Sequence, residues 1–211
     1  METYINYTII VHAILGGIGL LLGIMSMIVV KGSAKHKLFG KFFSYSILLC
    51  CLLSLIISSI PTHENTLLFL IGLFTIYLVL AGNNALTLTN KDKIEITFYD
   101  RLITGSMILV TFVMFGLGVY YYFLNNTFWL LFCFFGVLGT FLIRKDIIAY
   151  KSFRTNRKIG LINHIGRMIG ALISSFTAFL VAGAQIKFLI VWFIPTLFGL
   201  PFIIYWVRKV K

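Results

Sequence analysis

Seven long apolar runs, separated by short polar segments, dominate the chain. Each is close to the roughly 20 residues that an α-helix needs to cross the hydrocarbon core of a bilayer. The runs lie at Ile5–Val30, Phe42–Ile60, Thr66–Leu88, Leu102–Leu124, Phe128–Ile143, Met168–Ile186 and Phe188–Val207. This pattern predicts an all-α integral membrane protein in which residues 1–211 form a single bundle of seven transmembrane helices.

Composition supports lipid as the main solvent of this chain. Hydrophobic residues make up 60% of it and charged residues only 11%, whereas soluble domains carry about 25% charged residues. The formal net charge of +12 could suggest nucleic acid. The basic residues, however, cluster beside the apolar runs, as membrane topology requires. We therefore expect the lipid bilayer as partner, with anionic lipid at the cytoplasmic face and no nucleic acid.

The distribution of lysine and arginine predicts the orientation. Seventeen of the 18 basic residues follow the first, third, fifth or seventh run, and only Lys187 follows an even-numbered one. Because positive residues accumulate on the cytoplasmic side, the N-terminus should lie outside and the C-terminus in the cytoplasm. The expected location is a membrane that the chain crosses several times.

A regular stripe of small residues runs along the first apolar segment. His12, Gly16, Gly19, Gly23 and Ser26 are spaced by four, three, four and three residues, which places them on one helical face. Glycines at this spacing let another helix approach closely. An imidazole within a membrane helix is either a functional group or a structural hydrogen-bond donor to a neighbouring helix, and both interpretations stay open for His12.

Two further histidines lie in the basic segments. His36 stands in Lys31–Lys41, which we interpret as a short basic hairpin, and His164 opens the sixth predicted helix. Together with Lys37 and Arg167 they predict a cytoplasmic pocket for an anionic ligand or a lipid headgroup. The alternative is that these are separate, solvated residues at the membrane interface.

Other polar residues occur near the same predicted face. Asn83 and Asn84 lie near the inner end of the third run, and two carboxamides at that depth could face a polar cavity or ligand. Asp100 with Arg101, and the segment Arg144–Asp146, are expected to form surface ion pairs of small energetic value.

The four histidines also allow a redox hypothesis. His12 and His63 fall toward the outer face, and His36 and His164 toward the inner face. Haem b takes two neutral imidazoles, so two pairs of histidines could carry electrons across a bilayer. His63 lies in a loop beside Pro61, which weakens the outer pair. No catalytic residue and no metal site is indicated.

Several segments together resemble a family of small bacterial multi-spanning membrane proteins that has no assigned function. The segments are His36-Lys37-Leu38-Phe39-Gly40-Lys41, His12 with Gly16 and Gly17, and His-x-Gly-Arg-Met at His164 to Met168. The resemblance implies a multi-helix architecture in a bacterial inner (cytoplasmic) membrane and implies no reaction.

Two function classes follow, and whether the protein is an enzyme stays open. The favoured one is a non-enzymatic membrane component: a carrier of a small solute or lipid, or a subunit of a larger envelope assembly. The alternative is a haem b or quinol-linked protein that transfers electrons across the membrane through bis-histidine sites.

Overall fold

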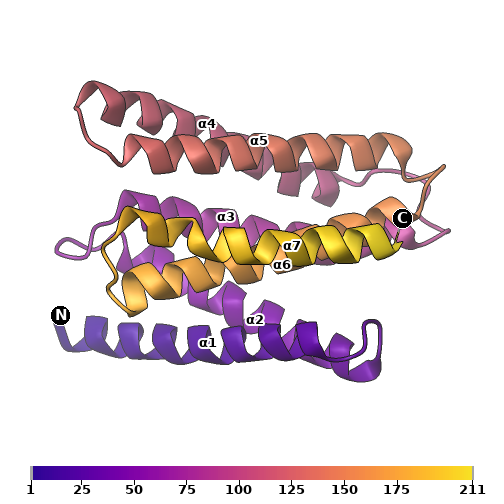
Figure 1. Cartoon of the computed structure of the whole chain (residues 1–211), viewed down its shortest axis with the longest axis horizontal. Helices are drawn as coiled ribbons and strands as arrows, with labels where there is room; N and C mark the ends of the chain where they lie inside the picture. The colour runs from indigo at the N-terminus through magenta and orange to yellow at the C-terminus, as the bar shows by residue number, and fades with distance from the viewer. Residues whose placement is uncertain (1, 211) are drawn as a thin grey trace. The chain divides into compact units, whose positions relative to one another are not determined.

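The computed structural model describes residues 2–210, and within this range it is helical with no β-strand (Figure 1). Helix accounts for 82% of the structure. The described α-helices are α1 (Glu2–Ile28), α2 (Ala34–Ile57), α3 (Thr66–Ala85), α4 (Phe98–Phe123), α5 (Trp129–Ser152), α6 (Lys158–Ala178) and α7 (Ile194–Val210). The prediction of seven helices is confirmed for this part of the chain.

Six of these helices are long and apolar enough to cross a membrane, and α5 is the exception. Helix α5 has 24 residues, which is sufficient length. Its apolar part, however, is followed directly by Arg144, Lys145 and Asp146. The apolar run therefore ends at Ile143, whereas the helix continues to Ser152.

Several helices begin earlier than the apolar runs that predicted them. Helix α2 starts at Ala34, because the Ser33 side chain caps it and accepts a hydrogen bond from the His36 backbone N–H at 3.2 Å. The expected basic hairpin is therefore a short turn at Gly32, whose φ of +79° suits glycine. Apolar runs mark the part of a helix that fits hydrocarbon, not the residues at which the helix ends.

The last predicted helix is irregular at its start. A 3₁₀ turn at Leu189–Trp192 precedes α7, which then continues to Val210 with Pro201 inside it. Pro195 lies in the first turn of α7, where its missing N–H costs nothing. The irregular backbone thus precedes the helix, which continues through Pro201.

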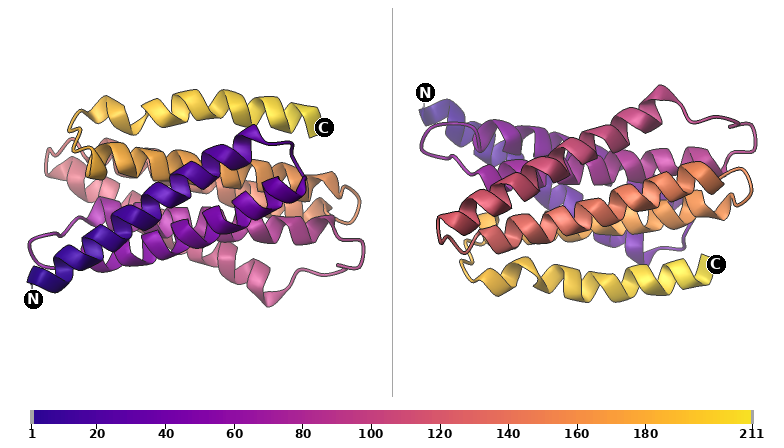
Figure 2. Two further views of the ribbon diagram at one scale, coloured as in Figure 1. Left: turned by 90° about the horizontal axis from the view of Figure 1, so that it is seen from below. Right: turned by 90° about the horizontal axis from the view of Figure 1, so that it is seen from above.

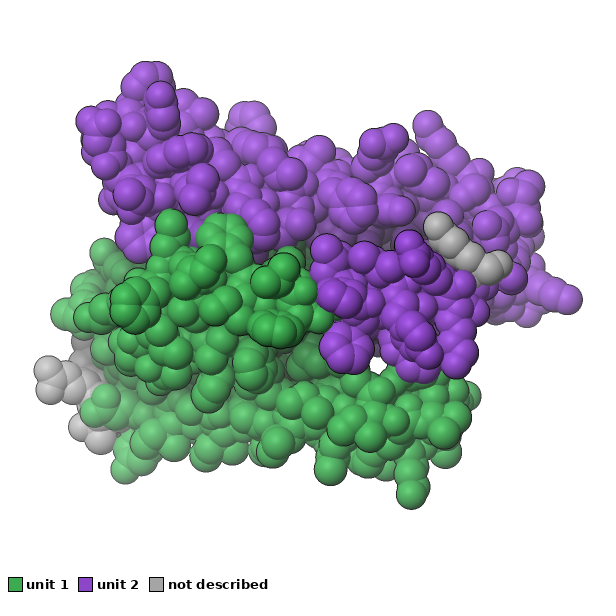
Figure 3. All heavy atoms as spheres, viewed as in Figure 1, with its two compact units in different colours: residues 1–79, 170–199 green, residues 80–169, 200–211 purple. Residues whose placement is uncertain are grey.

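The chain divides into two compact units, each described here by itself (Figure 3). Unit 1 comprises residues 1–79 and 170–199, and unit 2 comprises residues 80–169 and 200–211. The division falls within α3, α6 and α7.

In unit 1 the glycine stripe of α1 packs against other helices (Figure 2). A Cβ atom added at Gly19 would lie 2.5 Å from Cδ1 of Ile47 in α2. One added at Gly23 would lie 2.7 Å from Leu172 of α6 and 2.9 Å from Phe43 of α2. The prediction that this stripe faces helices is confirmed.

A buried hydrogen bond joins α3 and α6 in the same unit. The hydroxyls of Thr75 and Ser174 lie 2.7 Å apart, and both residues are buried. Each hydroxyl therefore has a hydrogen-bond partner inside the protein and is not left unpaired in lipid.

In unit 2, α4 and α5 form an antiparallel pair joined by a short turn after Leu124 (Figure 2). Glycines again make close approach possible, since a Cβ atom at Gly118 would lie 2.7 Å from the Cys133 sulfur. At Gly139 it would collide with Thr111. The start of α4 and the end of α5 consequently lie at the same end of this pair.

Candidate functional site

Two buried aspartates lie at this end of unit 2. Asp100 has no exposed surface and Asp146 is 5% exposed. The interpretation of both as members of surface ion pairs was wrong. Because most of this chain is apolar, a carboxylate is most stable where cations and N–H groups surround it inside the protein.

Asp100 is held by five hydrogen bonds. Its Oδ1 accepts from Asn84 Nδ2 at 2.6 Å and from Lys93 Nζ at 2.9 Å. Its Oδ2 accepts from Lys93 Nζ and from both the backbone N–H and the hydroxyl of Thr97, each at 2.7 Å. Thr97 in turn caps α4, which completes a capping box. The cationic partner of Asp100 is Lys93 and not the adjacent Arg101.

Asn83 and Asn84, near the end of the third apolar run, differ in how far they are buried. Asn84 is half-buried and reaches Asp100, so the polar partner expected for it is present. Asn83 is exposed. Its assignment to a ligand or headgroup stays a prediction.

Asp146 pairs with Arg167 of α6 in the interior of unit 2. The Arg167 Nη2 lies 2.6 Å from Asp146 Oδ1 and donates also to the Leu142 carbonyl at 2.8 Å. Only 3% of the Arg167 side chain and 7% of the Asp146 side chain are exposed. The interpretation of Arg167 as a solvated residue was therefore wrong, while its contact with a lipid headgroup stays a prediction.

Tyr150 links the two aspartates. Its hydroxyl donates to the Asp100 carbonyl at 2.9 Å and lies 2.9 Å from Thr104 Oγ1. Thr104 also lies 3.2 Å from Asp146 Oδ2. Burial raises the pKa of Tyr150 to about 12, so this hydroxyl keeps its proton at neutral pH. We call these connected residues the aspartate network: Asn84, Lys93, Thr97, Asp100, Thr104, Asp146, Tyr150 and Arg167.

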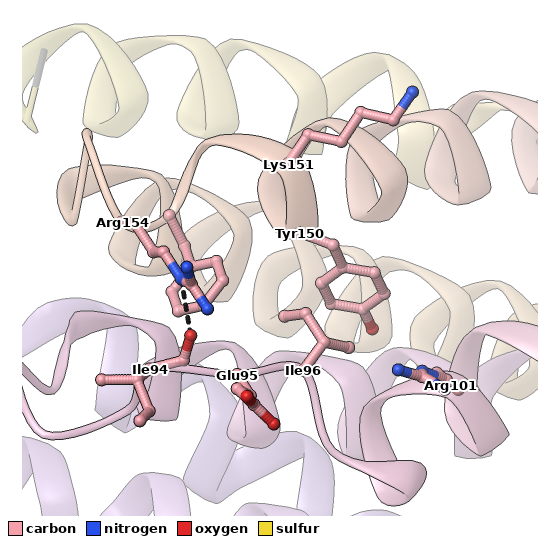
Figure 4. A pocket seen from close by; sticks show the side chains of 8 residues that line it. Ile94, Glu95, Ile96, Arg101, Tyr150, Lys151 and Arg154 are labelled. Carbon is pink, nitrogen blue, oxygen red and sulfur yellow. Dashed lines mark hydrogen bonds between the residues drawn. The ribbon is translucent and has the colours of Figure 1, made fainter.

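A cavity of about 470 Å³ opens beside Tyr150 (Figure 4). We call it the Tyr150 cavity, and its lining residues are Ile94, Glu95, Ile96, Arg101, Tyr150, Lys151, Phe153 and Arg154. Three of them are cationic and one is anionic. The cavity thus combines a positive lining with the buried network behind Tyr150.

Two arginines hold the loop that forms one wall of this cavity. Arg154 Nε donates to the Ile94 carbonyl at 2.5 Å. Arg157 Nη1 donates to the carbonyls of Asn90 and Lys93 at 2.9 and 3.0 Å, and its guanidinium lies 5.1 Å from the centre of the Phe153 ring. These contacts tie residues 90–94 to the end of α5 and the start of α6.

Three histidines make the same type of bond to a backbone carbonyl. His12 Nδ1 lies 2.9 Å from the Cys50 carbonyl, His36 Nδ1 lies 3.0 Å from that of Ser26, and His164 Nδ1 lies 2.8 Å from that of Gly82. A ring nitrogen that meets a carbonyl must carry the proton. Each histidine therefore donates to the backbone of another helix, which agrees with the structural alternative given for His12.

His36 shares its acceptor with Lys31. Lys31 Nζ donates to the Ser26 carbonyl at 3.0 Å and also to that of Met27. Both side chains therefore satisfy carbonyls in the last turn of α1, where cations are favoured. Desolvation by burial lowers the pKa of Lys31. Lys37, next to His36 in the first turn of α2, is exposed.

The inner pair of predicted haem ligands is divided between the units. His36 belongs to unit 1 and His164 to unit 2, so their shared pocket stays a prediction. His12 and His63 both belong to unit 1, where His63 is exposed in the turn before α3. The lining of the Tyr150 cavity includes no histidine. Among the described residues, no group of three or more His, Cys, Asp or Glu side chains could hold a metal.

No family model, curated protein or solved structure matches this chain. The family resemblance therefore stays an expectation. A function must be inferred from the residues themselves.

Several members of the site were not predicted from the sequence, namely Lys93, Thr104, Tyr150 and Arg154. One signal was available, because the chain has only six acidic residues, and Asp100 and Asp146 both lie within three residues of an apolar run. An acidic residue next to a membrane helix needs a cation, and Lys93 is seven residues from Asp100. Tyr150 and Thr104 offered no comparable signal.

Proposed function

We propose that this chain is a multi-pass protein of the bacterial inner membrane, with its N-terminus outside and its C-terminus in the cytoplasm. Six helices with the length and composition of membrane spans support this proposal. With seven crossings, 17 of the 18 basic residues fall on the cytoplasmic side.

The aspartate network explains how α5 can be the seventh span despite its charged residues. Arg144 and Lys145 are exposed and can reach lipid headgroups, whereas Asp146 is neutralised by Arg167. Pairing removes most of the cost of placing a carboxylate near hydrocarbon. Helix α5 then crosses the bilayer with its apolar part, which begins at Trp129, extended toward the interface by the helical residues from Asp146 to Tyr150.

We infer that the protein is a non-enzymatic membrane component that binds an anionic ligand at its cytoplasmic face. The observation that carries this inference is the Tyr150 cavity, positively lined and placed next to a fixed polar network. Both buried carboxylates are already engaged by cations, which favours binding over acid–base chemistry. A carrier of a small solute or lipid and a subunit of an envelope assembly both fit such a site.

Reporter fusions test the topology. A reporter that is active only in the cytoplasm should work when fused at the C-terminus and fail within residues 61–65. Activity of a periplasmic reporter at the C-terminus would contradict the proposal.

Labelling of single cysteines tests the location of the cavity. A membrane-impermeant maleimide should label an Arg154→Cys variant in inside-out vesicles and leave it unlabelled in intact spheroplasts. The matched control is Lys187→Cys, which should show the opposite pattern, since Lys187 is the basic residue assigned to the outer side. Labelling of Arg154→Cys in spheroplasts would place the cavity on the wrong face.

A further inference from the structure

We propose that the Tyr150 cavity binds a phosphate group, and that this group is the headgroup of an anionic phospholipid. This inference rests on the proposed function, because it names the ligand of the same cytoplasmic site. It is carried by the charge of the lining, by the arrangement of its arginines and by the apolar surface around it.

The charge of the lining favours an anion. Arg101, Lys151 and Arg154 contribute three positive charges, and Glu95 contributes one negative charge. Figure 4 shows Lys151 directed away from the other side chains, so the two arginines are the cations best placed for a ligand. Guanidinium groups suit phosphate because their planar N–H groups can make paired, charge-assisted hydrogen bonds.

Arg154 is oriented in advance for such a contact. Its Nε donates to the Ile94 carbonyl, which fixes the plane of the guanidinium while Nη1 and Nη2 keep further N–H groups for a ligand. Tyr150 lines the cavity, and its hydroxyl is already engaged by the Asp100 carbonyl and by Thr104. Holding a cation in its bound orientation reduces the entropy lost on binding.

The surface near the cavity distinguishes a lipid from a free phosphate compound. Ile94 is 67% exposed, and at the start of α4, on either side of Arg101, Phe98 is 79% and Leu102 54% exposed. Apolar and aromatic side chains beside cations are typical of the boundary between headgroups and acyl chains. The acyl chains of a phospholipid held at the cavity can pack on this apolar surface, whereas a soluble phosphate ester has no apolar part that could do so.

Substitution of Glu95 tests whether the ligand is negatively charged. It lines the cavity and repels an anion, so Glu95→Gln should strengthen binding while Arg101→Gln weakens it. Arg101 suits this purpose because it is exposed and its removal leaves the aspartate network intact. The matched control is Arg144→Gln, the same substitution at an exposed arginine outside the cavity.

The experiment is native mass spectrometry of the full chain, purified in a neutral detergent and titrated with phosphatidylglycerol or phosphatidylcholine. We expect phosphatidylglycerol to bind more tightly than phosphatidylcholine. Arg101→Gln should weaken it about tenfold, as loss of one charge-assisted hydrogen bond predicts, and Glu95→Gln should strengthen it. Equal effects of Arg101→Gln and Arg144→Gln would overturn the assignment of the cavity.

A competition experiment distinguishes a phospholipid from a soluble phosphate compound as the ligand. Glycerophosphoglycerol, the deacylated form of phosphatidylglycerol, carries the same singly charged phosphodiester without acyl chains and should displace the lipid only at concentrations far above that of phosphatidylglycerol. Displacement at equal concentrations would overturn the lipid assignment. The titration is made in detergent and does not depend on membrane orientation, so its failure can be distinguished from a failure of the topology tests.

Discussion

The two units connect their helices by different means. In unit 1, α1 and α2 approach through the glycine stripe, with two imidazoles, those of His12 and His36, bonded to backbone carbonyls of the opposite helix. In unit 2, α3 to α6 are connected by buried ion pairs and by Tyr150. Close apolar packing distributes its energy over many weak contacts, whereas a charge network concentrates it in a few. The two units should therefore respond differently to single substitutions.

The largest effect is expected when the buried ion pair of unit 2 is broken on one side. Arg167→Leu leaves the Asp146 carboxylate buried without its cation and should destabilise the protein by about 3–5 kcal/mol. The measurement is an SDS titration of the protein in mild detergent. Arg144→Leu, at an exposed arginine in the helical turn just before Asp146, is the control and should change stability little.

The double variant sharpens this test. Adding Asp146→Leu to Arg167→Leu removes both charges and should recover most of the lost stability, because an apolar pair needs no compensation. A double variant as unstable as Arg167→Leu alone would show that packing, and not charge, dominates at this position.

An intermediate effect is expected in unit 1. Gly19→Leu places a side chain against Ile47 and should cost about 1–3 kcal/mol by overpacking. Leu21→Ala is the control on another face, where Leu21 is 65% exposed. The same SDS titration applies. If both variants lose the same stability, the stripe is not a tight interface.

The glycine stripe could be predicted from the sequence, and the partners of the aspartates could not. The stripe is a local pattern, since residues three and four apart share one helical face, and its contacts followed directly from its spacing. Asp146 and Arg167 are separated by a turn and belong to different helices. Which cation meets which carboxylate depends on packing angles that no local spacing contains. The assumption that adjacent charges pair therefore failed for Asp100.

Helix ends were predicted poorly for a related reason. Hydropathy responds to the hydrocarbon core, whereas a helix ends where its backbone groups find other partners. Ser33 at α2 and the capping box of Thr97 and Asp100 at α4 set two of these ends. The cap at Thr97 could have been found from the sequence, because a threonine followed three positions later by an acidic residue is a recognisable helix start.

A smaller loss of stability is expected when the hydroxyl of Tyr150, which links the two aspartates, is removed. Tyr150→Phe keeps the ring and removes the hydroxyl, so the Asp100 carbonyl and Thr104 each lose a partner. The expected cost is about 1 kcal/mol. Tyr99→Phe, at an exposed tyrosine next to Asp100 in the sequence, serves as the control. A Tyr150→Phe protein as stable as this control would mean that the two aspartates are held independently.

The smallest effect is expected at His12, and it separates the structural interpretation from the haem hypothesis. The ring donates to the Cys50 carbonyl, and such bonds between membrane helices contribute about 0.6 kcal/mol. His12→Leu should lose this amount, and His12→Gln should recover part of it, because a carboxamide can donate to the same carbonyl. If the ring were a haem ligand through Nε2, glutamine could not replace it, and both variants would lose a Soret absorption band present in the parent protein. We expect the purified protein to be colourless, with His12→Gln closer in stability to the parent than His12→Leu. A Soret band that shifts on reduction and disappears in both variants would establish the redox class instead.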